Sequence, residues 1–219
     1  MTKSQSSRNT RQVAKRMPSP VGTLTLVATD AGLAAILWEN DRPGRVRLKI
    51  AAEESGHPVL VDTERQLAEY FAGQRTQFAL PLDWSGTAFQ RQVWSALLTI
   101  PFGETRSYAQ IAAQIGRPGA ARAVGAANGR NPVSIVAPCH RVIGSSGALT
   151  GFAGGLDVKA RLLALESRRL SLTNHHPQPV SSATPRTPVP VTTRRVSVPC
   201  RQQSGTAGAR IPPPGPVSV

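Results

Sequence analysis

The chain has 219 residues, of which 19 are proline and 19 are glycine, and it carries a net charge of +14. This length allows one or two small domains, whereas the proline and glycine content indicates that part of the chain is not packed. Two cysteines exclude a disulfide framework, no Cys/His cluster has zinc spacing, and no apolar run is long enough for a bilayer. We therefore expect a soluble cytoplasmic protein without a metal or a membrane anchor.

Most of the net positive charge of the chain comes from its two ends. Residues 1–16 hold five basic residues and residues 168–219 hold seven, and neither end holds an acidic one. Between them, residues 17–87 contain six basic and nine acidic residues, and residues 88–167 contain eight and three. A basic second lobe favours a polyanion such as nucleic acid as the partner. On charge alone, arginine-rich tails that only aid solubility explain the excess equally well.

The first elements predict a small α/β domain over residues 17–83. Residues 1–16 have no apolar period, and we expect a disordered basic arm there. The alternating segment GTLTLVAT (22–29) and the returning segment LAAILW (33–38) are separated by turn residues, which predicts a β-hairpin.

A helix and a short strand are predicted to complete this domain. The segment DTERQLAEYFAG (62–73) places its apolar residues on one face of a helix. Asp62 or Thr63 is the expected N-cap, and Gly73 the expected end. QFALPL (77–82) is typical of a short strand.

Residues 84–168 predict a second, mainly helical domain. Thr87 is the natural N-cap of a helix that ends before Pro101. The segments SYAQIAAQIG (107–116) and AARAVGAANG (120–129) predict two further short helices. Two short helices joined by a glycine-containing turn are typical of a helix-turn-helix.

The second helix of this pair consists almost entirely of alanine and glycine, with Arg122 as its one long side chain. Such a backbone can approach a partner very closely. The pattern fits tight helix packing and nucleic-acid contact equally well.

The last predicted helix begins at Asp157 and carries Glu166 on its apolar side. A carboxylate in that position needs a partner or has a raised pKa. Considered alone, a salt bridge at the rim of the core is the more common explanation. From residue 169 to residue 219 the chain is rich in Pro, Ser, Thr and Arg, and we expect a disordered tail.

Cys139 lies between Pro138 and His140, and this pairing suggests nucleophilic chemistry. A cysteine reacts as its thiolate, so it needs help to lose its proton. Neighbouring side chains of an extended backbone point to opposite faces, so His140 needs a bend or a bridging water to act on Cys139. If Glu166 reaches His140, the three form a relay. This chemistry is equally compatible with a cysteine hydrolase.

The order of motifs resembles the O6-alkylguanine-DNA alkyltransferases, also called methylated-DNA protein-cysteine methyltransferases. The resemblance covers residues 84–167 in register and the first domain more loosely. The motifs that carry it are SYAQIA (107–112), AARAVG (120–125), NP (131–132), PCHRV (138–142) and LLALE (162–166). The resemblance implies a ribonuclease-H-like topology for the first domain.

The resemblance also implies direct repair, in which a damaged guanine is flipped out of the duplex and its O6-alkyl group moves to Cys139. His140 matches the base that acts through a water, and Glu166 matches the third member of the relay. Asn131 matches the asparagine that ties the helix-turn-helix to the active-site segment.

Further residues correspond to the DNA and base contacts of the family. Tyr108 matches the tyrosine that helps to rotate the nucleotide and binds the base, and Arg122 matches the finger that fills the vacated stack. The small residues Ala121, Ala126 and Ala127 are expected at the minor groove, and Val142, Phe152 and Ala153 at the base. Phe152 and Ala153 stand where some members have Tyr and Ser, so hydroxyl contacts are lost there.

We therefore expect a monomer that repairs double-stranded DNA containing O6-alkylguanine at the nucleoid, once per molecule and without a cofactor. The sequence leaves open the range of alkyl groups, cooperative binding, and the roles of the tails and Cys200. Three alternatives make distinct predictions. A non-catalytic lesion binder shows no transfer, a helix-turn-helix regulator needs a specific operator, and a cysteine hydrolase turns over repeatedly.

Overall fold

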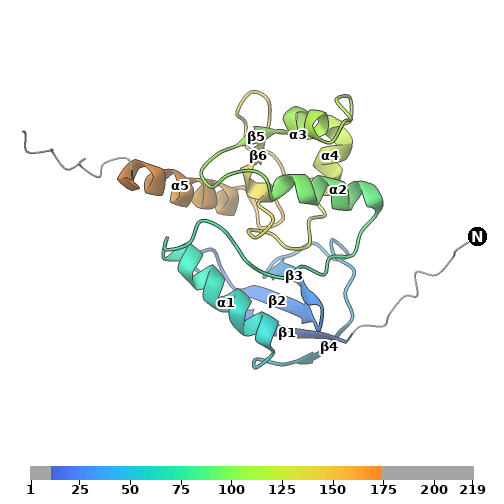
Figure 1. The fold of residues 1–219 in the computed structure, drawn as a ribbon, viewed down its shortest axis with the longest axis vertical. Helices are drawn as coiled ribbons and strands as arrows, with labels where there is room; N and C mark the ends of the chain where they lie inside the picture. The colour runs from blue at the N-terminus through green and yellow to red at the C-terminus, as the bar shows by residue number, and fades with distance from the viewer. Residues whose placement is uncertain (1–10, 174–219) are drawn as a thin grey trace, which may run out of the picture. The chain divides into compact units, whose positions relative to one another are not determined.

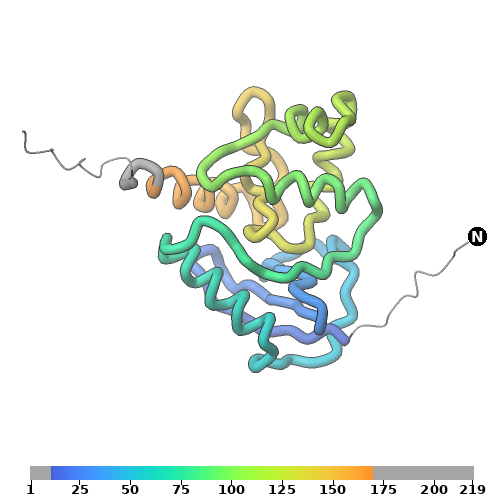
Figure 2. Tube along the Cα trace, in the orientation of Figure 1, coloured from blue at the N-terminus to red at the C-terminus, as the bar shows by residue number. Residues whose placement is uncertain are grey.

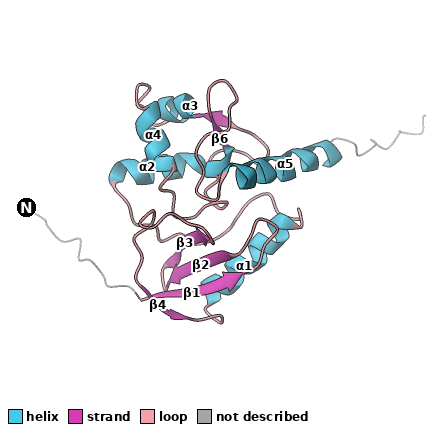
Figure 3. Ribbon diagram, turned by 180° about the vertical axis from the view of Figure 1, so that it is seen from behind, coloured by secondary structure: helices cyan, strands magenta, loops and turns pink. Residues whose placement is uncertain are grey.

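A four-stranded mixed sheet forms the first half of the computed structural model, which describes residues 11–173. Its strands are β1 (Gln12–Met17), β2 (Leu24–Thr29), β3 (Gly32–Trp38) and β4 (Ile50–Glu53), in the order β3-β2-β1-β4. β2 pairs antiparallel with β1 and β3, which confirms the predicted hairpin, and β4 pairs parallel with β1. Helix α1 (Pro58–Phe71) packs on one face of this sheet (Figures 1 and 3).

Strand β1 corrects the prediction of a disordered arm over residues 1–16. Its residues lie inside the sheet between β2 and β4, and Val13, Ala14 and Met17 are buried. Basic residues interrupt the apolar pattern of this strand. The sheet accommodates one of them, Lys15, because it forms an ion pair with Glu64 at 2.5 Å. A strand that reads as polar in the sequence is therefore central to the sheet. Residues 1–10 lie outside the described residues.

Helix α1 begins one turn earlier than the sequence predicts. It starts at Pro58, after His57, rather than at Asp62 or Thr63. Proline suits the first helical position, because the amide hydrogen that it lacks would have no partner there. The predicted end is confirmed, since Gly73 follows the helix with a φ of 73°.

The strand predicted over residues 77–82 is wrong. Only Leu82 bridges Leu33, and the Leu33 amide donates to the Pro81 carbonyl oxygen at 2.8 Å. A Cβ on Gly32 would lie 2.5 Å from that carbonyl oxygen. Because Gly32 has no side chain, residues 77–82 can approach the start of β3 closely and cross its edge without pairing along it.

The second half is mainly helical. The starts of its first helices agree with the sequence, whereas the last helix begins at Leu156, so Asp157 lies in its first turn and does not cap it. Thr87 and Ser107 each cap a helix through a complete capping box with the glutamine three residues later. The elements are α2 (Ala88–Leu97), β5 (Arg106–Ser107), α3 (Tyr108–Gln114), α4 (Ala121–Asn128), the 3-10 turn η1 (Cys139–Arg141), β6 (Val142–Ile143) and α5 (Leu156–Thr173). Figure 2 shows the trace from α2 to α5.

Helix α5 corrects the predicted start of the tail. It continues through residues 169–173, where the sequence predicts disorder, and residues 174–219 lie outside the described residues. None of the helices within residues 11–173 is long and apolar enough to cross a membrane.

One apolar core runs through both halves of the described chain. Buried residues of the sheet and of α1, such as Leu26 and Leu67, belong to the same cluster as Trp94, Ile111 and Val142. The amide of Ile36 in β3 also donates to the carbonyl oxygen of Pro132 at 2.8 Å. The sheet therefore supports the segment that leads to Cys139.

Candidate active site around Cys139

Cys139 begins the short 3-10 turn η1, and the backbone there is not extended. The backbone thus bends here, which is one of the two possibilities that the sequence leaves open for His140 to act on Cys139. Only 3% of Cys139 is exposed, and its thiol lies 3.9 Å from Ser134 Oγ. No hydrogen bond between Cys139 Sγ and the His140 ring occurs among residues 11–173. The two groups are neighbours in the sequence that share no hydrogen bond.

The surroundings of Cys139 keep its thiol protonated at rest. Burial raises the pKa of this thiol above its ordinary value, and this effect outweighs the hydrogen bonds from Asn131 and Ser134. The positive charges of Arg45 and Lys159 act weakly in the opposite direction. Thiolate formation therefore needs a nearby base.

Asn131 organises the segment between α4 and Cys139. Its side-chain amide donates to the Ala137 carbonyl oxygen at 2.7 Å, and its side-chain oxygen accepts from the Val133 amide at 3.1 Å. Between these two contacts Ile135 is fully buried and adopts a φ of 74°, in the left-handed region. The side chain of Asn131 thus holds a tight turn immediately before the cysteine.

Glu166 is fully buried, which rules out a salt bridge at the rim of the core. Its Oε1 accepts from Tyr70 Oη at 2.8 Å, from His140 Nε2 at 2.8 Å and from Arg141 Nη2 at 2.9 Å. Its Oε2 accepts from the Gly103 amide at 3.0 Å and from Arg141 Nε at 2.9 Å. From the sequence we expect a partner for this carboxylate, and the structure provides several hydrogen-bond donors from different segments of the chain.

The charge of Glu166 is stabilised where it lies. Burial alone would raise the pKa of this carboxyl group, but hydrogen bonds and charges from His140 and Arg141 lower it to about 2. Arg141 is itself held by the Ile100 carbonyl oxygen at 2.6 Å and lies over the ring of Phe102. Glu166 is therefore a carboxylate at neutral pH.

His140 has one engaged nitrogen and one free nitrogen. Because a carboxylate can only accept, Nε2 carries the proton and donates to Glu166. Nδ1 is buried without a hydrogen-bond partner among the described residues. Burial lowers the pKa of the ring, although Glu166 opposes this effect. The neutral ring therefore presents an unprotonated nitrogen, which is suited to accept a proton.

The loop before α5 forms a wall beside this group. The ring of Phe152 packs edge-on against Trp38 at 5.3 Å and near His140 at 6.4 Å, and Ala153 is half-buried beside it. A Cβ on Gly154 would lie 2.8 Å from the indole of Trp38, so this position requires glycine. Trp38 also donates to Ser134 Oγ at 3.4 Å.

Lys159 is a buried cation that the sequence analysis missed. Its ammonium group donates to the carbonyl oxygens of Val142 at 2.6 Å and Thr150 at 2.8 Å. It thereby joins the active-site segment to the loop that contains Phe152. Val142, which the sequence predicts at the flipped guanine, therefore already accepts a hydrogen bond from Lys159 through its carbonyl oxygen.

The helix-turn-helix consists of α3 and α4. Tyr108 begins α3, and its hydroxyl oxygen accepts from Thr150 at 3.1 Å. On α4, Arg122 and Ala126 are exposed and Ala121 is half-buried. Ala127 is 3% exposed, and its carbonyl oxygen accepts from Trp94 Nε1 at 2.9 Å. Ala127 thus contributes to the packing of α4, and its contact with the minor groove stays a prediction.

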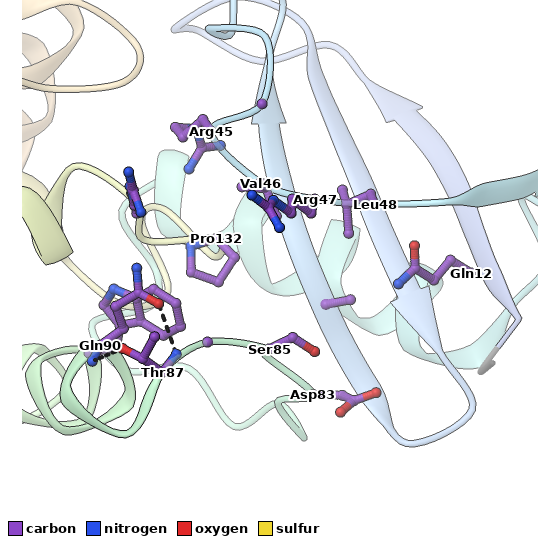
Figure 4. Close-up of a pocket in the computed structure, with 15 residues that line it drawn as sticks. Gln12, Arg45, Val46, Arg47, Leu48, Asp83, Ser85, Thr87, Gln90 and Pro132 are labelled. Atoms are coloured by element: carbon purple, nitrogen blue, oxygen red, sulfur yellow. Dashed lines mark hydrogen bonds between the residues drawn. The ribbon is translucent and has the colours of Figure 1, made fainter. Parts of the chain in front are cut away.

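Arg45 joins the loop after β3 to the active-site segment. It is ion-paired with Asp41 at 2.5 Å, and it donates to the backbone carbonyl oxygens of Ile36 and Asn131. Figure 4 shows Arg45 near Pro132 at the rim of a pocket of about 490 Å³, which also contains the start of α2. Cys139 does not line this pocket.

Two parts of the chain match known domains. Residues 14–84 match the ribonuclease-like domain of the 6-O-methylguanine DNA methyltransferase family, and residues 88–168 match its DNA binding domain. These matches confirm the predicted ribonuclease-like α/β half and the helical DNA-binding half.

Known proteins of this family are similar to most of the chain. The methylated-DNA--protein-cysteine methyltransferase of Mycolicibacterium paratuberculosis is 52% identical over 159 residues, which cover 70% of this chain and 92% of that protein. The constitutive enzyme of Bacillus subtilis is 48% identical over 154 residues, which cover 65% and 93%. A crystal structure of Mycobacterium tuberculosis OGT in complex with DNA has a TM-score of 0.63 and 48% identity, and covers 72% of this chain and 94% of that chain. The chain therefore belongs to the 6-O-methylguanine DNA methyltransferase family, and its activity is DNA repair by transfer of the methyl group to a cysteine.

Proposed function

We propose that Cys139 is the residue that accepts the alkyl group from O6-alkylguanine. The observation that carries this proposal is the neutral His140 ring, which is bound to Glu166 through Nε2 and leaves Nδ1 free close to a buried thiol. His140 takes the thiol proton through a bridging water. Glu166 then stabilises the imidazolium that forms.

The transfer is a single displacement at the alkyl carbon. The Cys139 thiolate supplies the electron pair of the new S–C bond, the C–O6 bond breaks, and guanine leaves with the electrons of that bond. The proton that His140 took from the thiol then passes to the departing guanine, so guanine leaves neutral and the His140 ring is neutral again. The product is a thioether, which neither water nor a second thiol opens, so each molecule acts once.

The exposed face of α4 is the surface that we assign to double-stranded DNA containing O6-alkylguanine. Ala121 and Ala126 leave room for its backbone to approach the minor groove, and Arg122 is placed to enter the stack. Asn131 keeps the following segment in place, and Tyr108, Val142, Phe152 and Ala153 receive the flipped base. We further propose that the protein acts as a monomer at the nucleoid in the cytoplasm.

The mass of the intact protein tests this proposal most directly. After incubation with a duplex containing one O6-methylguanine, we expect a gain of one methylene mass that maps to Cys139 and stops after one equivalent. A lesion that stays bound without a change in mass would instead support a non-catalytic lesion binder. Repeated turnover on an acyl substrate would support a cysteine hydrolase.

Replacing Arg122 by alanine is expected to impair base flipping more than binding to the groove. Unstacking a base costs a few kcal/mol, and the inserted side chain offsets part of this cost, so single-turnover transfer should slow by roughly tenfold or more. The measurement combines the transfer rate with the fluorescence of a 2-aminopurine beside the lesion. Arg65→Ala, which removes the same charge from α1, is the control. An unchanged flipping signal in Arg122→Ala would contradict the assignment.

A further inference from the structure

A tyrosine of the sheet-bearing half reaches the centre of the proposed relay. Tyr70 lies near the end of α1 and is fully buried, and its hydroxyl donates to Glu166 Oε1 at 2.8 Å. The rings of Phe71, Phe78 and Phe102 lie 5.4 to 6.2 Å from its own ring. Of the described residues that donate to Glu166, Tyr70 alone comes from the first half of the chain.

Tyr70 and His140 share one acceptor atom. Both donate to Glu166 Oε1, which also accepts from Arg141 Nη2, whereas the Gly103 amide and Arg141 Nε donate to Oε2. An oxygen that already accepts a strong hydrogen bond has less negative charge to offer a second donor. The hydroxyl of Tyr70 therefore limits how strongly Glu166 attracts the proton of the His140 ring.

We propose that Tyr70 is a positioning residue of the transfer reaction, which fixes Glu166 Oε1 against His140 and sets the proton affinity of that ring from the first domain. This inference rests on the proposed roles of Cys139, His140 and Glu166. Tyr70 has no place in those roles, because it contacts neither the thiol nor the surface assigned to DNA.

The charged groups around the His140 ring also affect its pKa, and the effect of Tyr70 is superimposed on theirs. From η1, Arg141 opposes protonation of His140, and from α5, Lys159 does the same while Glu166 favours it. Cys139 is the remaining titratable neighbour on η1. From α1 only the neutral hydroxyl of Tyr70 faces this group. Burial, reinforced by the charge of Glu166, raises the pKa of Tyr70 well above its ordinary value, so it stays a donor throughout the working pH range.

Tyr70→Phe removes this hydroxyl and keeps the ring. Glu166 Oε1 then attracts the imidazolium more strongly, and His140 gains its proton at higher pH. We expect the acid limb of the pH–rate profile for single-turnover transfer to move up by roughly half a pH unit, because such coupled hydrogen bonds change pKa values by fractions of a unit to a few units. The loss of a fixed carboxylate should also slow transfer at neutral pH by roughly three- to tenfold. The affinity for the lesion duplex should stay unchanged.

Thr63→Val is the matched control for the loss of a buried hydroxyl in α1. Thr63 is buried and donates to the Val59 carbonyl oxygen within the helix at 2.7 Å. Thermal unfolding of both variants reports any general destabilisation. A purely structural role for Tyr70 predicts that both variants lose stability and keep the wild-type pH profile.

A second substitution keeps the test decisive if Tyr70→Phe does not fold. Introducing 3-fluorotyrosine at position 70 preserves the shape and strengthens the donor, so the acid limb should move to lower pH. An unshifted profile in whichever variant folds would overturn the inference. Failure of the wild-type protein to methylate Cys139 would instead overturn the proposed function, so the two failures are distinguishable.

Discussion

Replacing Cys139 by alanine will abolish methyl transfer and leave binding to the lesion duplex intact. The thiol is the proposed nucleophile, and no other described cysteine can replace it. It is also buried, whereas Arg122 and Ala126 on the face of α4 that we assign to DNA are exposed. The variant therefore keeps its DNA surface and should form a long-lived complex with unrepaired DNA. Intact mass and a gel-shift titration on the same duplex measure the two properties separately.

Cys200→Ala is the control for this experiment, because it removes the other cysteine of the chain. It should gain one methylene mass at the wild-type rate. Transfer by Cys139→Ala, or a methyl group mapped to Cys200 in the wild-type protein, would refute Cys139 as the acceptor. Loss of both transfer and DNA binding in Cys139→Ala would show that the thiol supports the DNA surface as well.

Replacing Glu166 by glutamine is expected to reduce both stability and transfer strongly. The amide cannot accept hydrogen bonds at both of its ends, so Arg141 and His140 or Tyr70 lose an acceptor inside the protein. Breaking a buried ion pair costs about 3 to 5 kcal/mol of unfolding free energy. Without a carboxylate to stabilise the imidazolium, transfer should fall by roughly a hundredfold or more.

The stability loss in Glu166→Gln should depend on pH in a defined direction. The folded-state pKa of Glu166 is about 2, below the ordinary value of 4.5. The ionised group therefore contributes its full stabilisation above about pH 4.5, and this contribution is lost as the pH falls toward 2. The difference in unfolding free energy between wild type and variant should be largest at neutral pH and shrink within this window.

Urea denaturation at several pH values measures this difference. Glu104→Gln is the control, because Glu104 forms an exposed ion pair with Arg106 at 2.8 Å. Such surface pairs contribute less than about 1 kcal/mol. A Glu166→Gln variant no less stable than this control would contradict the buried network.

Local signals in the sequence predicted the helical half well and the sheet less well. Thr87 and Ser107 cap their helices through residues only three positions away, so the sequence contains the whole interaction. Strand β1 was missed because its basic residues are accommodated by partners far along the chain, as Lys15 is by Glu64. The conformation of residues 77–82 likewise depends on the close approach of Pro81 to Gly32, which is distant in the sequence, and not on the apolar pattern of the segment itself.

The same distinction applies to the candidate site. The motif order identified Cys139, His140 and Glu166, and the structure brings His140 and Glu166 into contact. Tyr70 reads as an ordinary apolar helix position in the sequence, and Lys159 reads as a surface lysine. Their roles depend on contacts with Glu166 and with the Val142 carbonyl, which no spacing within one segment reveals.

Ile135 shows how the site achieves its rigidity. A β-branched side chain in the left-handed region raises the conformational energy by roughly 1 to 3 kcal/mol. The side chain of Asn131 and full burial of Ile135 hold this conformation in place. The energy of this unfavourable torsion is thus compensated when the chain folds, before any lesion binds. Cys139 is preorganised, and little backbone reorganisation should contribute to the activation barrier of transfer.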